Sequence, residues 1–308
     1  MRARPPFPKV VDSTMLATAR SCYQKFFQTY MEHWKPQGES IHLHAGRCFA
    51  KGLEMARRAH YEWGKDPEES IGRGLVALTE EWGDFQAPEG TAKTLERMLG
   101  ALEFYFDAYP LDTDKATPMV MPSGKRGIEF SFAEPLSFLN PETNEPVIYS
   151  GRSDMLANWA EGLYVEDDKT TTQLGASWSR QWDLRSQFTG YCWAARKARL
   201  PVAGVLVRGV SILKTKYDTQ QAITYRSDWE IERWEAQVLR DLKRIQECWE
   251  AGYWDYNLDH ACSEYGGCAF QPICKSPAPE QWLPVYFERR KWDPLERTET
   301  LLPEPMAA

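Results

Sequence analysis

The sequence predicts an α/β protein with a mixed central sheet flanked by helices, a helical N-terminal part and a cysteine-containing C-terminal segment. Three observations support this fold class. Residues 13–109 carry apolar side chains at helical spacing, residues 128–168 contain consecutive strand-like segments, and a helix and a further strand follow them. With 308 residues, 43% of them hydrophobic and 13% aromatic, the chain can bury a large core, which excludes a disordered or fibrous protein.

Four helices are predicted in the first third of the chain. The first extends from residue 13 to about residue 32, with Asp12 or Ser13 as its N-cap. Helical spacing of apolar residues predicts the other three over residues 45–63, 70–82 and 91–109. Residues 110–126 are rich in turn residues and are expected to connect these helices to the sheet.

The predicted core has the order strand, strand, strand, helix, strand. Alternating or continuous apolar segments bounded by turn residues predict strands over residues 128–132, 147–157, 163–168, 202–213 and 222–226. Helices are expected over residues 180–198 and 228–250. The proline-rich tail from residue 276 is expected to wrap the surface or to be partly disordered.

The charge balance is acidic, with 37 Lys and Arg against 44 Asp and Glu and a formal net charge of -7. Many nucleic-acid-binding proteins are strongly basic, so this balance counts against DNA binding. It is weak evidence, because a nuclease that holds metal ions needs clustered carboxylates. The chain has neither a membrane-length apolar run nor the apolar run of a signal peptide near its start, so we expect a cytoplasmic protein without a membrane partner.

Acidic side chains and a lysine occupy two segments that are predicted to be neighbouring strands. Asp167 and Lys169 are two residues apart, so on a strand both side chains project from one face, where Asp154 of the paired strand can meet them. Two carboxylates, water and a substrate phosphate suit Mg²⁺. A lysine beside the metal can orient or deprotonate the attacking water. The same spacing is also common on solvated strand faces.

The helix predicted over residues 180–198 and the end of the lysine strand carry further candidates. Gln187 and Tyr191 are four residues apart and share a helix face, from which an amide and a phenol could contact one nucleic-acid strand. Arg185 belongs to a group of basic residues that could bind phosphates, and the Thr170 hydroxyl could bind phosphate oxygens. Ordinary helix packing and solvated positions are the alternatives.

Three of the seven cysteines, Cys262, Cys268 and Cys274, recur at equal intervals in a short segment, which predicts a metal site. Because no export signal is evident, the thiols are expected to stay reduced rather than to form disulfides. The intervals are wider than the two-residue gap of common zinc knuckles. Neither composition nor spacing separates an iron-sulfur cluster from a structural Zn²⁺. His260 could complete a local zinc site of three cysteines and one histidine. The remaining upstream cysteines Cys48, Cys192 and Cys248 are interpreted as small buried hydrophobes.

Taken in order, these motifs resemble the PD-(D/E)XK nucleases of the RecB type. The resemblance covers roughly residues 13–274 and depends on Gly-Arg-Ser-Asp154, Asp167-Asp168-Lys169-Thr170, Gln187-Phe-Thr-Gly-Tyr191 and the cysteines. It implies a restriction-endonuclease-like core in a single nuclease domain over residues 1–275. Within that domain it implies a helical part (13–109), a catalytic core (126–250) and a cysteine segment (251–275) closing onto Cys22, followed by a tail (276–308).

The resemblance also assigns roles to residues. It implies that Asp154 and Asp167 bind Mg²⁺ or Mn²⁺, that Lys169 is the catalytic lysine, and that Gln187 and Tyr191 contact the nucleic-acid strand. In the branch of the family with a [4Fe-4S] cluster, one cysteine lies near the N-terminus and three near the C-terminus. Cys22 matches the first position, and Cys262, Cys268 and Cys274 match the others. The implied cluster is structural, with Zn²⁺ as the alternative.

One position departs from the family pattern. The family usually has a metal-binding histidine on an early helix in a Gly-x-x-x-His pattern, whereas Ala50 follows Gly46 at that spacing here. Glu54 lies one helical turn beyond Ala50 and could replace the histidine. Glu129, on the strand before Asp154, is the other candidate and is slightly favoured. The substitution is expected to weaken a second metal site rather than the first.

The sequence therefore predicts a Mg²⁺- or Mn²⁺-dependent deoxyribonuclease, an exonuclease acting on DNA ends or single strands in recombination, repair or DNA processing. Similar proteins act in phage recombination and in the adaptation stage of CRISPR systems. The resemblance therefore implies that the partners, besides DNA, include further copies of this chain or a recombination or CRISPR protein. The main alternative is a catalytically inactive DNA-binding or assembly protein that keeps the fold and the metal cluster. A zinc-stabilised module without a nucleic-acid role is ranked last.

Overall fold

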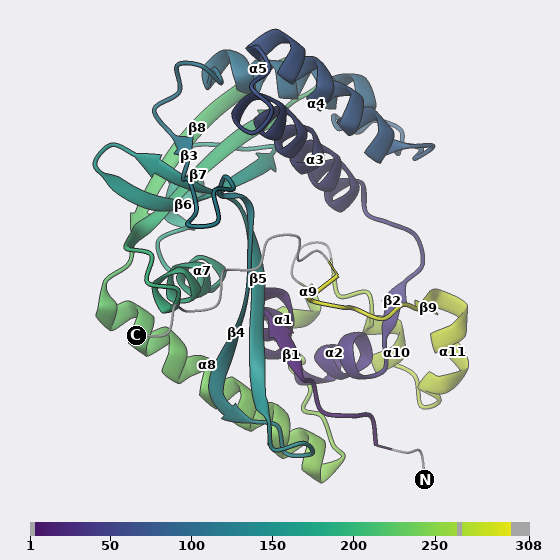
Figure 1. Ribbon diagram of the computed structural model, residues 1–308. Coiled ribbons are helices and arrows are strands. Elements are labelled where there is room, and N and C mark those ends of the chain that lie inside the picture. The colour runs from purple at the N-terminus through teal and green to yellow at the C-terminus, as the bar shows by residue number, and fades with distance from the viewer. Residues whose placement is uncertain (1–3, 264–266, 297–308) are drawn as a thin grey trace. The chain divides into compact units, whose positions relative to one another are not determined.

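A computed structural model describes residues 4–263 and 267–296. It confirms the predicted fold class, a mixed central sheet flanked by helices (Figure 1). The strand order is β1-β5-β6-β7-β8, and β3 and β4 also pair with β5. The β1–β5 and β6–β7 pairs are parallel, whereas β5–β6 and β7–β8 are antiparallel. The strands are β1 (Val10–Asp12), β3 (Thr117–Pro118), β4 (Ile128–Leu139), β5 (Pro146–Trp159), β6 (Gly162–Thr171), β7 (Val202–Ile212) and β8 (Tyr217–Tyr225).

The described residues form two compact units. Unit 1 comprises residues 4–38, 132–151 and 232–296, and unit 2 comprises residues 39–131 and 152–231. The helices of unit 2 are α3 (Ile41–Tyr61), α4 (Pro67–Trp82), α5 (Leu95–Ala108), α6 (Ala176–Arg180) and α7 (Ser186–Lys197). Unit 1 contains α1 (Ser13–Ser21), α2 (Tyr23–Phe26), the π-helix η1 (Phe27–Met31), α9 (His260–Ser263), α10 (Gln271–Cys274) and α11 (Pro279–Tyr286). The long helix α8 (Asp228–Ala251) contributes residues to both units.

Helices α3, α4 and α5 of unit 2 lie side by side and pack on one face of the sheet (Figure 1). Each begins with a side-chain cap, because Ser40, Asp66 and Thr94 each accept a backbone N–H from the following turn. The apolar sides of these helices bury Leu53 together with β7 side chains such as Val210. All three were predicted from helical spacing, and their ends lie within about four residues of the predicted ones.

On the other face of the unit 2 sheet, the helix predicted over residues 180–198 is α7, which begins only at Ser186, after a turn that follows the short helix α6. The chain turns between them, and the buried Arg226 fixes this turn by donating to the Trp182 carbonyl at 2.8 Å and to Thr189 Oγ1 at 2.9 Å. Trp178 of α6 packs so closely on Gly209 of β7 that a Cβ there would lie 2.3 Å from the indole. The spacing of apolar residues within the segment does not reveal these tertiary contacts, which explains why the start of the helix was predicted too early.

In unit 1, the predicted helix over residues 13–32 is wrong as a single element. The backbone is extended at Cys22, with φ of −164°, so the segment divides into α1, α2 and η1. The amide of Gln24, in the turn after this break, donates to the Asp255 carbonyl at 2.9 Å. Strand β1 directly precedes this segment and pairs with β5. It was not predicted.

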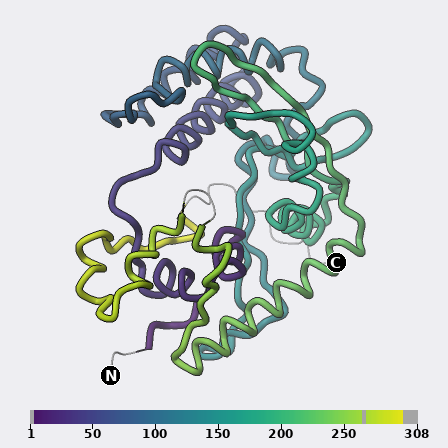
Figure 2. The backbone as a smooth tube through the Cα atoms, turned by 180° about the vertical axis from the view of Figure 1, so that it is seen from behind, coloured from purple at the N-terminus to yellow at the C-terminus, as the bar shows by residue number. Residues whose placement is uncertain are grey.

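The predicted tail is partly ordered structure. Helix α11 is followed by β9 (Phe287–Arg289), which pairs antiparallel with β2 (Trp34–Pro36) in a separate two-stranded sheet. Figure 2 shows this C-terminal segment in yellow beside the N-terminal part of unit 1 in purple. Such short strands carry little sequence signal, and a distant partner defines them. Residues 297–308 of the predicted tail lie outside the described residues.

Strands β4 and β8 depart most from their predicted bounds. Strand β4 continues to Leu139 rather than ending near residue 132, and β8 begins at Tyr217 rather than near residue 222. The added part of β8 has several polar residues, and its register with β7 pairs Tyr217 with Ile212. Backbone pairing with a neighbouring strand therefore sets these ends. No helix in the described residues has both the length and the apolarity required to cross a bilayer.

Candidate active site

Strands β5 and β6 bring Asp154, Asp167 and Lys169 together in unit 2. Lys169 and Asp167 form an ion pair on one face of β6. Asp154 Oδ2 accepts the backbone N–H of Asp168 at 2.6 Å, which holds its carboxylate against the same stretch of β6. Asp167 is buried, whereas the Lys169 side chain is 34% exposed. The site therefore has two adjacent carboxylates and an ammonium group that solvent can reach.

Burial and mutual repulsion raise the pKa values of both carboxyl groups. The pKa of Asp154 is well above its usual range, first because of burial and then because of the charges of Asp167, Asp168 and Glu129. Burial also raises the pKa of Asp167, although Lys169 and Arg185 act to lower it. For Lys169, burial acts to lower the pKa, but Asp167 and Asp154 outweigh it and raise the pKa. The lysine alone does not neutralise this carboxylate cluster, and such clusters favour a divalent cation.

Glu129 is the third carboxylate near Asp154. It is buried and forms an ion pair with Arg152 Nε at 2.7 Å, and burial raises its pKa to about 7. Its backbone is in the left-handed region, with φ of 53°. This conformation costs a non-glycine residue about 1 kcal/mol or more. Strained backbone that the surrounding structure maintains is frequent at functional sites.

Glu54, the alternative to Glu129, has a different environment on α3. Its two oxygens accept from Lys51 at 3.0 Å and from Arg58 at 2.9 Å. Burial acts to raise its pKa, but these two cations outweigh it and lower the pKa. Glu54 is thus neutralised by its neighbours, while Glu129 contributes to the repulsion at Asp154. Glu129 is therefore the candidate whose charge acts on Asp154, and Ala50 offers no ligand atom.

Helix α7 supplies the other predicted residues. Gln187 Nε2 donates to the Tyr191 hydroxyl at 2.7 Å, so the pair predicted to share a helix face does so. Tyr191 is buried, Gln187 is half-buried and Arg185 is exposed. Arg185 lies near enough to Asp167 for its charge to lower the pKa of that carboxyl group.

Thr170 lies apart from this group. Residues two apart on a strand share a face, so Thr170 is on the face of β6 opposite to Lys169. There its hydroxyl accepts from the buried Lys93 at 3.0 Å. The structure therefore does not bring Thr170 to the side chains of Asp167 and Lys169.

A buried ionic network on the α3 side of β6 was not predicted. Arg57 donates to Glu166 at 2.5 Å and to Asp168 at 2.8 Å. Tyr105 donates to the second oxygen of Asp168 at 2.7 Å. Nearby, Arg208 of β7 donates to both oxygens of Asp114, at 2.5 and 2.8 Å. The available signal was the alternation along β6, which places Glu166 and Asp168 opposite to Asp167 and Lys169.

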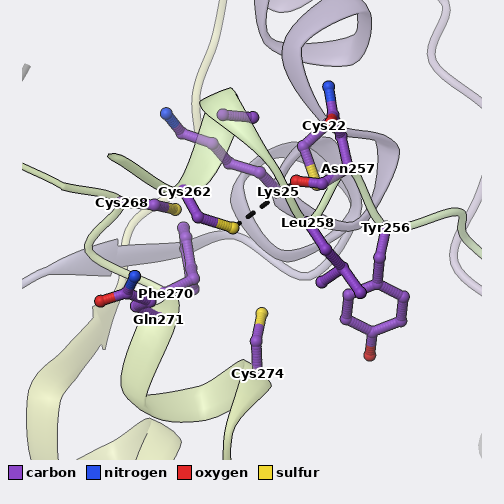
Figure 3. A pocket seen from close by; sticks show the side chains of 11 residues that line it. Cys22, Lys25, Tyr256, Asn257, Leu258, Cys262, Cys268, Phe270, Gln271 and Cys274 are labelled. Carbon is purple, nitrogen blue, oxygen red and sulfur yellow. Dashed lines mark hydrogen bonds between the residues drawn. The ribbon is translucent and has the colours of Figure 1, made fainter. Parts of the chain in front are cut away.

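The four cysteines implied by the family resemblance line one pocket in unit 1. Cys22, Cys262, Cys268 and Cys274 come from three separate segments, and Figure 3 shows their sulfur atoms facing the same small space. Two backbone hydrogen bonds shape the C-terminal part, from the Cys268 N–H to the Cys262 carbonyl at 2.9 Å and from the Gln271 N–H to the Cys268 carbonyl at 3.0 Å. Asn257, which also lines the pocket, donates to the Ser21 carbonyl beside Cys22 at 2.8 Å.

The thiols influence one another electrostatically. Burial raises the pKa of Cys274 to about 11, and the charges of Cys268, Cys22 and Cys262 add to this effect. His260, the alternative zinc ligand, is exposed and is not among the residues that line the pocket. Four thiols therefore line the pocket, although no three of them are arranged around a single ion in the described residues. Cys48, Cys192 and Cys248 are buried elsewhere, which confirms their interpretation as core residues.

Over residues 4–263 and 267–296, no three or more histidine, cysteine, aspartate or glutamate side chains are arranged so that they could hold a single metal ion. The acidic site therefore offers the carboxylate pair Asp154 and Asp167, with Glu129 as their electrostatic neighbour. Mg²⁺ is commonly held by one or two carboxylates together with water and substrate phosphate. The chemistry of the donors thus fits a hard divalent cation at this site.

No model of a known protein family matches the chain. No curated protein matches it in sequence. Among solved structures, it is similar to a protein from Eubacterium rectale described as a candidate exonuclease, with a TM-score of 0.52, 10% identity and coverage of 80% of this chain and 84% of that chain. At this identity the similarity shows a shared fold. The structure of a protein called SSO0001 superposes with a TM-score of 0.29 at 12% identity, over 65% of this chain and 74% of that chain.

Proposed function

We propose that this chain is a Mg²⁺- or Mn²⁺-dependent nuclease of the PD-(D/E)XK type that hydrolyses DNA phosphodiester bonds at ends or in single strands. The observation that carries the proposal is the convergence of Asp154, Asp167 and Lys169 at one point of the sheet in unit 2. The solved structure with a similar fold is described as a candidate exonuclease, which agrees with a nuclease.

Each residue has a distinct role in the proposed reaction. Asp154 and Asp167 hold the cation, with Glu129 as a further carboxylate close to it. A bound Mg²⁺ or Mn²⁺ would polarise the scissile phosphate and neutralise the leaving oxygen. Lys169 orients the attacking water and stabilises the negative charge that develops on the phosphorane. Arg185, which directly precedes α7, and Gln187, in its first turn, contact the DNA backbone.

The decisive experiment measures cleavage of end-labelled single- and double-stranded DNA with Mg²⁺ and with Mn²⁺. Lys169→Ala is expected to reduce the rate by about 10³-fold or more, because it removes the group that acts on the attacking water and on the developing charge. DNA binding is expected to change little, whereas the thermal stability of the metal-free variant is expected to fall, because the buried Asp167 loses its ion-pair partner. The matched control is Lys214→Ala, which removes an exposed lysine from the β7–β8 turn.

Three outcomes separate the possibilities. Metal-dependent cleavage that is lost in Lys169→Ala and kept in Lys214→Ala supports the proposal. Cleavage that survives in Lys169→Ala contradicts the assigned mechanism. If the unsubstituted chain binds DNA but never cleaves it, the alternative of a catalytically inactive DNA-binding or assembly protein is correct. Ala50, at the position where the family usually has a histidine, is the observation that favours this alternative.

For the cysteine pocket we propose a structural [4Fe-4S] cluster held by Cys22, Cys262, Cys268 and Cys274, with Zn²⁺ as the alternative. Four thiols around one pocket are the donor set of such clusters, and the position of His260 gives no support to a site with three cysteines and one histidine. Anaerobic purification followed by iron and zinc analysis tests this assignment. A brown protein that contains iron supports iron-sulfur, whereas a colourless zinc protein contradicts it.

A further inference from the structure

We propose that Arg57 and Tyr105 are positioning residues that orient the Asp154 carboxylate, and that they do so through Asp168. Neither residue has a part in the nuclease mechanism described above, and both lie on the face of β6 opposite to Asp167 and Lys169. The inference rests on the proposed function, because that function gives Asp154 its role as a metal ligand.

The first link is the fixed side chain of Asp168. Arg57 Nη1 donates to its Oδ2 at 2.8 Å, and the Tyr105 hydroxyl donates to its Oδ1 at 2.7 Å. Arg57 also donates to the Tyr105 hydroxyl at 2.8 Å, which closes a ring of three side chains. With both carboxylate oxygens bound, the Asp168 side chain has one orientation.

The second link is the backbone of Asp168. The β5–β6 ladder runs from the pair Trp159 and Gly162 to the pair Met155 and Glu166. Beyond its last pair, the Asp168 N–H donates at 2.6 Å to the side chain of Asp154 instead. The direction of this single N–H therefore influences the orientation of the carboxylate. By holding the Asp168 side chain, Arg57 and Tyr105 fix the residue whose amide anchors Asp154.

Stability alone is a poor explanation for this arrangement. Arg57 and Glu166 are both buried, at 4% and 0% exposed, and their ion pair at 2.5 Å must offset a large desolvation cost. Apolar residues of similar volume often stabilise a core as well as a buried ion pair does. A network with directional hydrogen bonds additionally fixes the position of β6. Residues that orient a metal ligand through hydrogen bonds commonly change metal affinity when they are substituted.

The first experiment needs no metal. Tyr105→Phe removes one of the two donors to Asp168 and keeps the aromatic ring. We expect the Asp168 amide to exchange its hydrogen at least about 10-fold faster in this variant, measured by NMR on the metal-free full chain. The matched control is Tyr61→Phe, which removes a hydroxyl that donates at 2.7 Å to the Leu111 carbonyl. That variant is expected to leave the Asp168 amide unchanged.

The second experiment measures Mn²⁺ binding by calorimetry, with Asp154→Asn defining the part of the signal that belongs to the proposed site. Tyr105→Phe is expected to weaken this binding by about 10-fold, while Tyr61→Phe stays within about two-fold of the unsubstituted protein. Arg57→Lys, which keeps the charge but replaces the planar group that reaches Glu166, Asp168 and Tyr105, is expected to weaken it at least as much.

The outcomes distinguish this inference from the proposed function. Asp154-dependent Mn²⁺ binding that Tyr105→Phe leaves unchanged, or that both tyrosine variants weaken equally, overturns the positioning role and leaves the nuclease proposal standing. Unchanged exchange of the Asp168 amide in Tyr105→Phe also overturns it. If the unsubstituted chain shows no Asp154-dependent Mn²⁺ binding, the metal role of Asp154 fails, and this inference fails with it.

Discussion

The acidic site of unit 2 and the cysteine pocket of unit 1 gather their ligands in different ways. In the acidic site, hydrogen bonds fix ligand side chains directly, as when Asp154 accepts the Asp168 N–H. In the pocket, the Cys262 thiol donates to the Asn257 carbonyl at 3.5 Å, and backbone bonds such as that from the Cys268 N–H to the Cys262 carbonyl shape the short segments that carry the thiols. The acidic site is thus held between neighbouring strands of one sheet, whereas the pocket is built from short helices and turns that come from distant parts of the chain.

This difference indicates what each bound metal would contribute. At the acidic site, a cation would relieve repulsion that already raises the pKa of Asp154 and Glu129. At the cysteine pocket, a metal would join Cys22 to Cys262, which are about 240 residues apart in the sequence. The first metal is expected to act mainly in chemistry and the second mainly in stability. Three predictions, each with its own control, can break or sharpen this distinction.

The largest effect is expected from Cys262→Ser. Loss of this thiol is expected to release the metal, and losing a cross-link that closes a loop of about 240 residues lowers the free energy of unfolding by about 5 kcal/mol in the chain-entropy account. Metal content per chain and urea unfolding would measure this effect. By contrast, Asp154→Asn should leave the stability of the metal-free protein unchanged or higher, because it removes a buried charge that its neighbours repel.

The control for the pocket is Cys248→Ala, at a buried cysteine of α8 that does not line it. Loss of a small buried side chain is expected to cost about 1 kcal/mol and to leave the metal content unchanged. Cys262→Ser with normal metal content and normal stability would contradict the structural role proposed for the pocket.

Much of the acidic site could be predicted because its residues follow local spacing. Two-residue spacing on a strand placed Asp167 and Lys169 on one face, and four-residue spacing on a helix placed Gln187 beside Tyr191. The same rule shows why Thr170 lies apart, since an adjacent strand residue must face the other way. The role of Asp168 could not be predicted, because Arg57 and Tyr105 reach it from helices far away in the sequence.

The prediction of elements failed where tertiary contacts override local preference. The helix breaks at Cys22, although neither glycine nor proline is present there to predict a break. The turn before α7 depends on Arg226, which follows β8. Strands β2 and β9 are three residues long and pair across most of the chain. In each case the deciding partner is remote, so periodicity within a window cannot reveal it.

The second prediction concerns pH and the metal-free acidic site. Glu129 has a pKa of about 7 in the folded chain, above its usual 4.5, chiefly because it is buried. As pH rises between these values, the unfolded state releases its proton first, so the free energy of unfolding falls, by about 3 kcal/mol at most from this group. Urea unfolding at pH 5 and pH 8 should show this loss in the original protein and a smaller loss in Glu129→Gln.

Glu54→Gln supplies a control with the opposite sign. The folded pKa of Glu54 is lowered, because Lys51 and Arg58 outweigh its burial, so its ionised form stabilises the fold and the variant should be less stable at pH 8. In the metal-free pocket, the Cys274 thiol has a pKa of about 11 and stays protonated throughout this range. A pH dependence that Glu129→Gln leaves unchanged would show that the loss arises outside this carboxyl group.

The smallest effect is expected from Arg185→Ala. This variant tests whether the residues that contact DNA lie only near the acidic site of unit 2. Arg185 is exposed, and its charge acts on Asp167, so a phosphate held near the metal would lie within its reach. We expect DNA affinity to fall about 3- to 10-fold and the salt dependence of binding to decrease by about one phosphate contact. The matched variant is Arg290→Ala, at an exposed arginine of unit 1. Equal losses of DNA affinity in both variants would mean that unit 1 also contacts DNA. The cysteine-containing unit would then have a role in DNA binding as well as in stability.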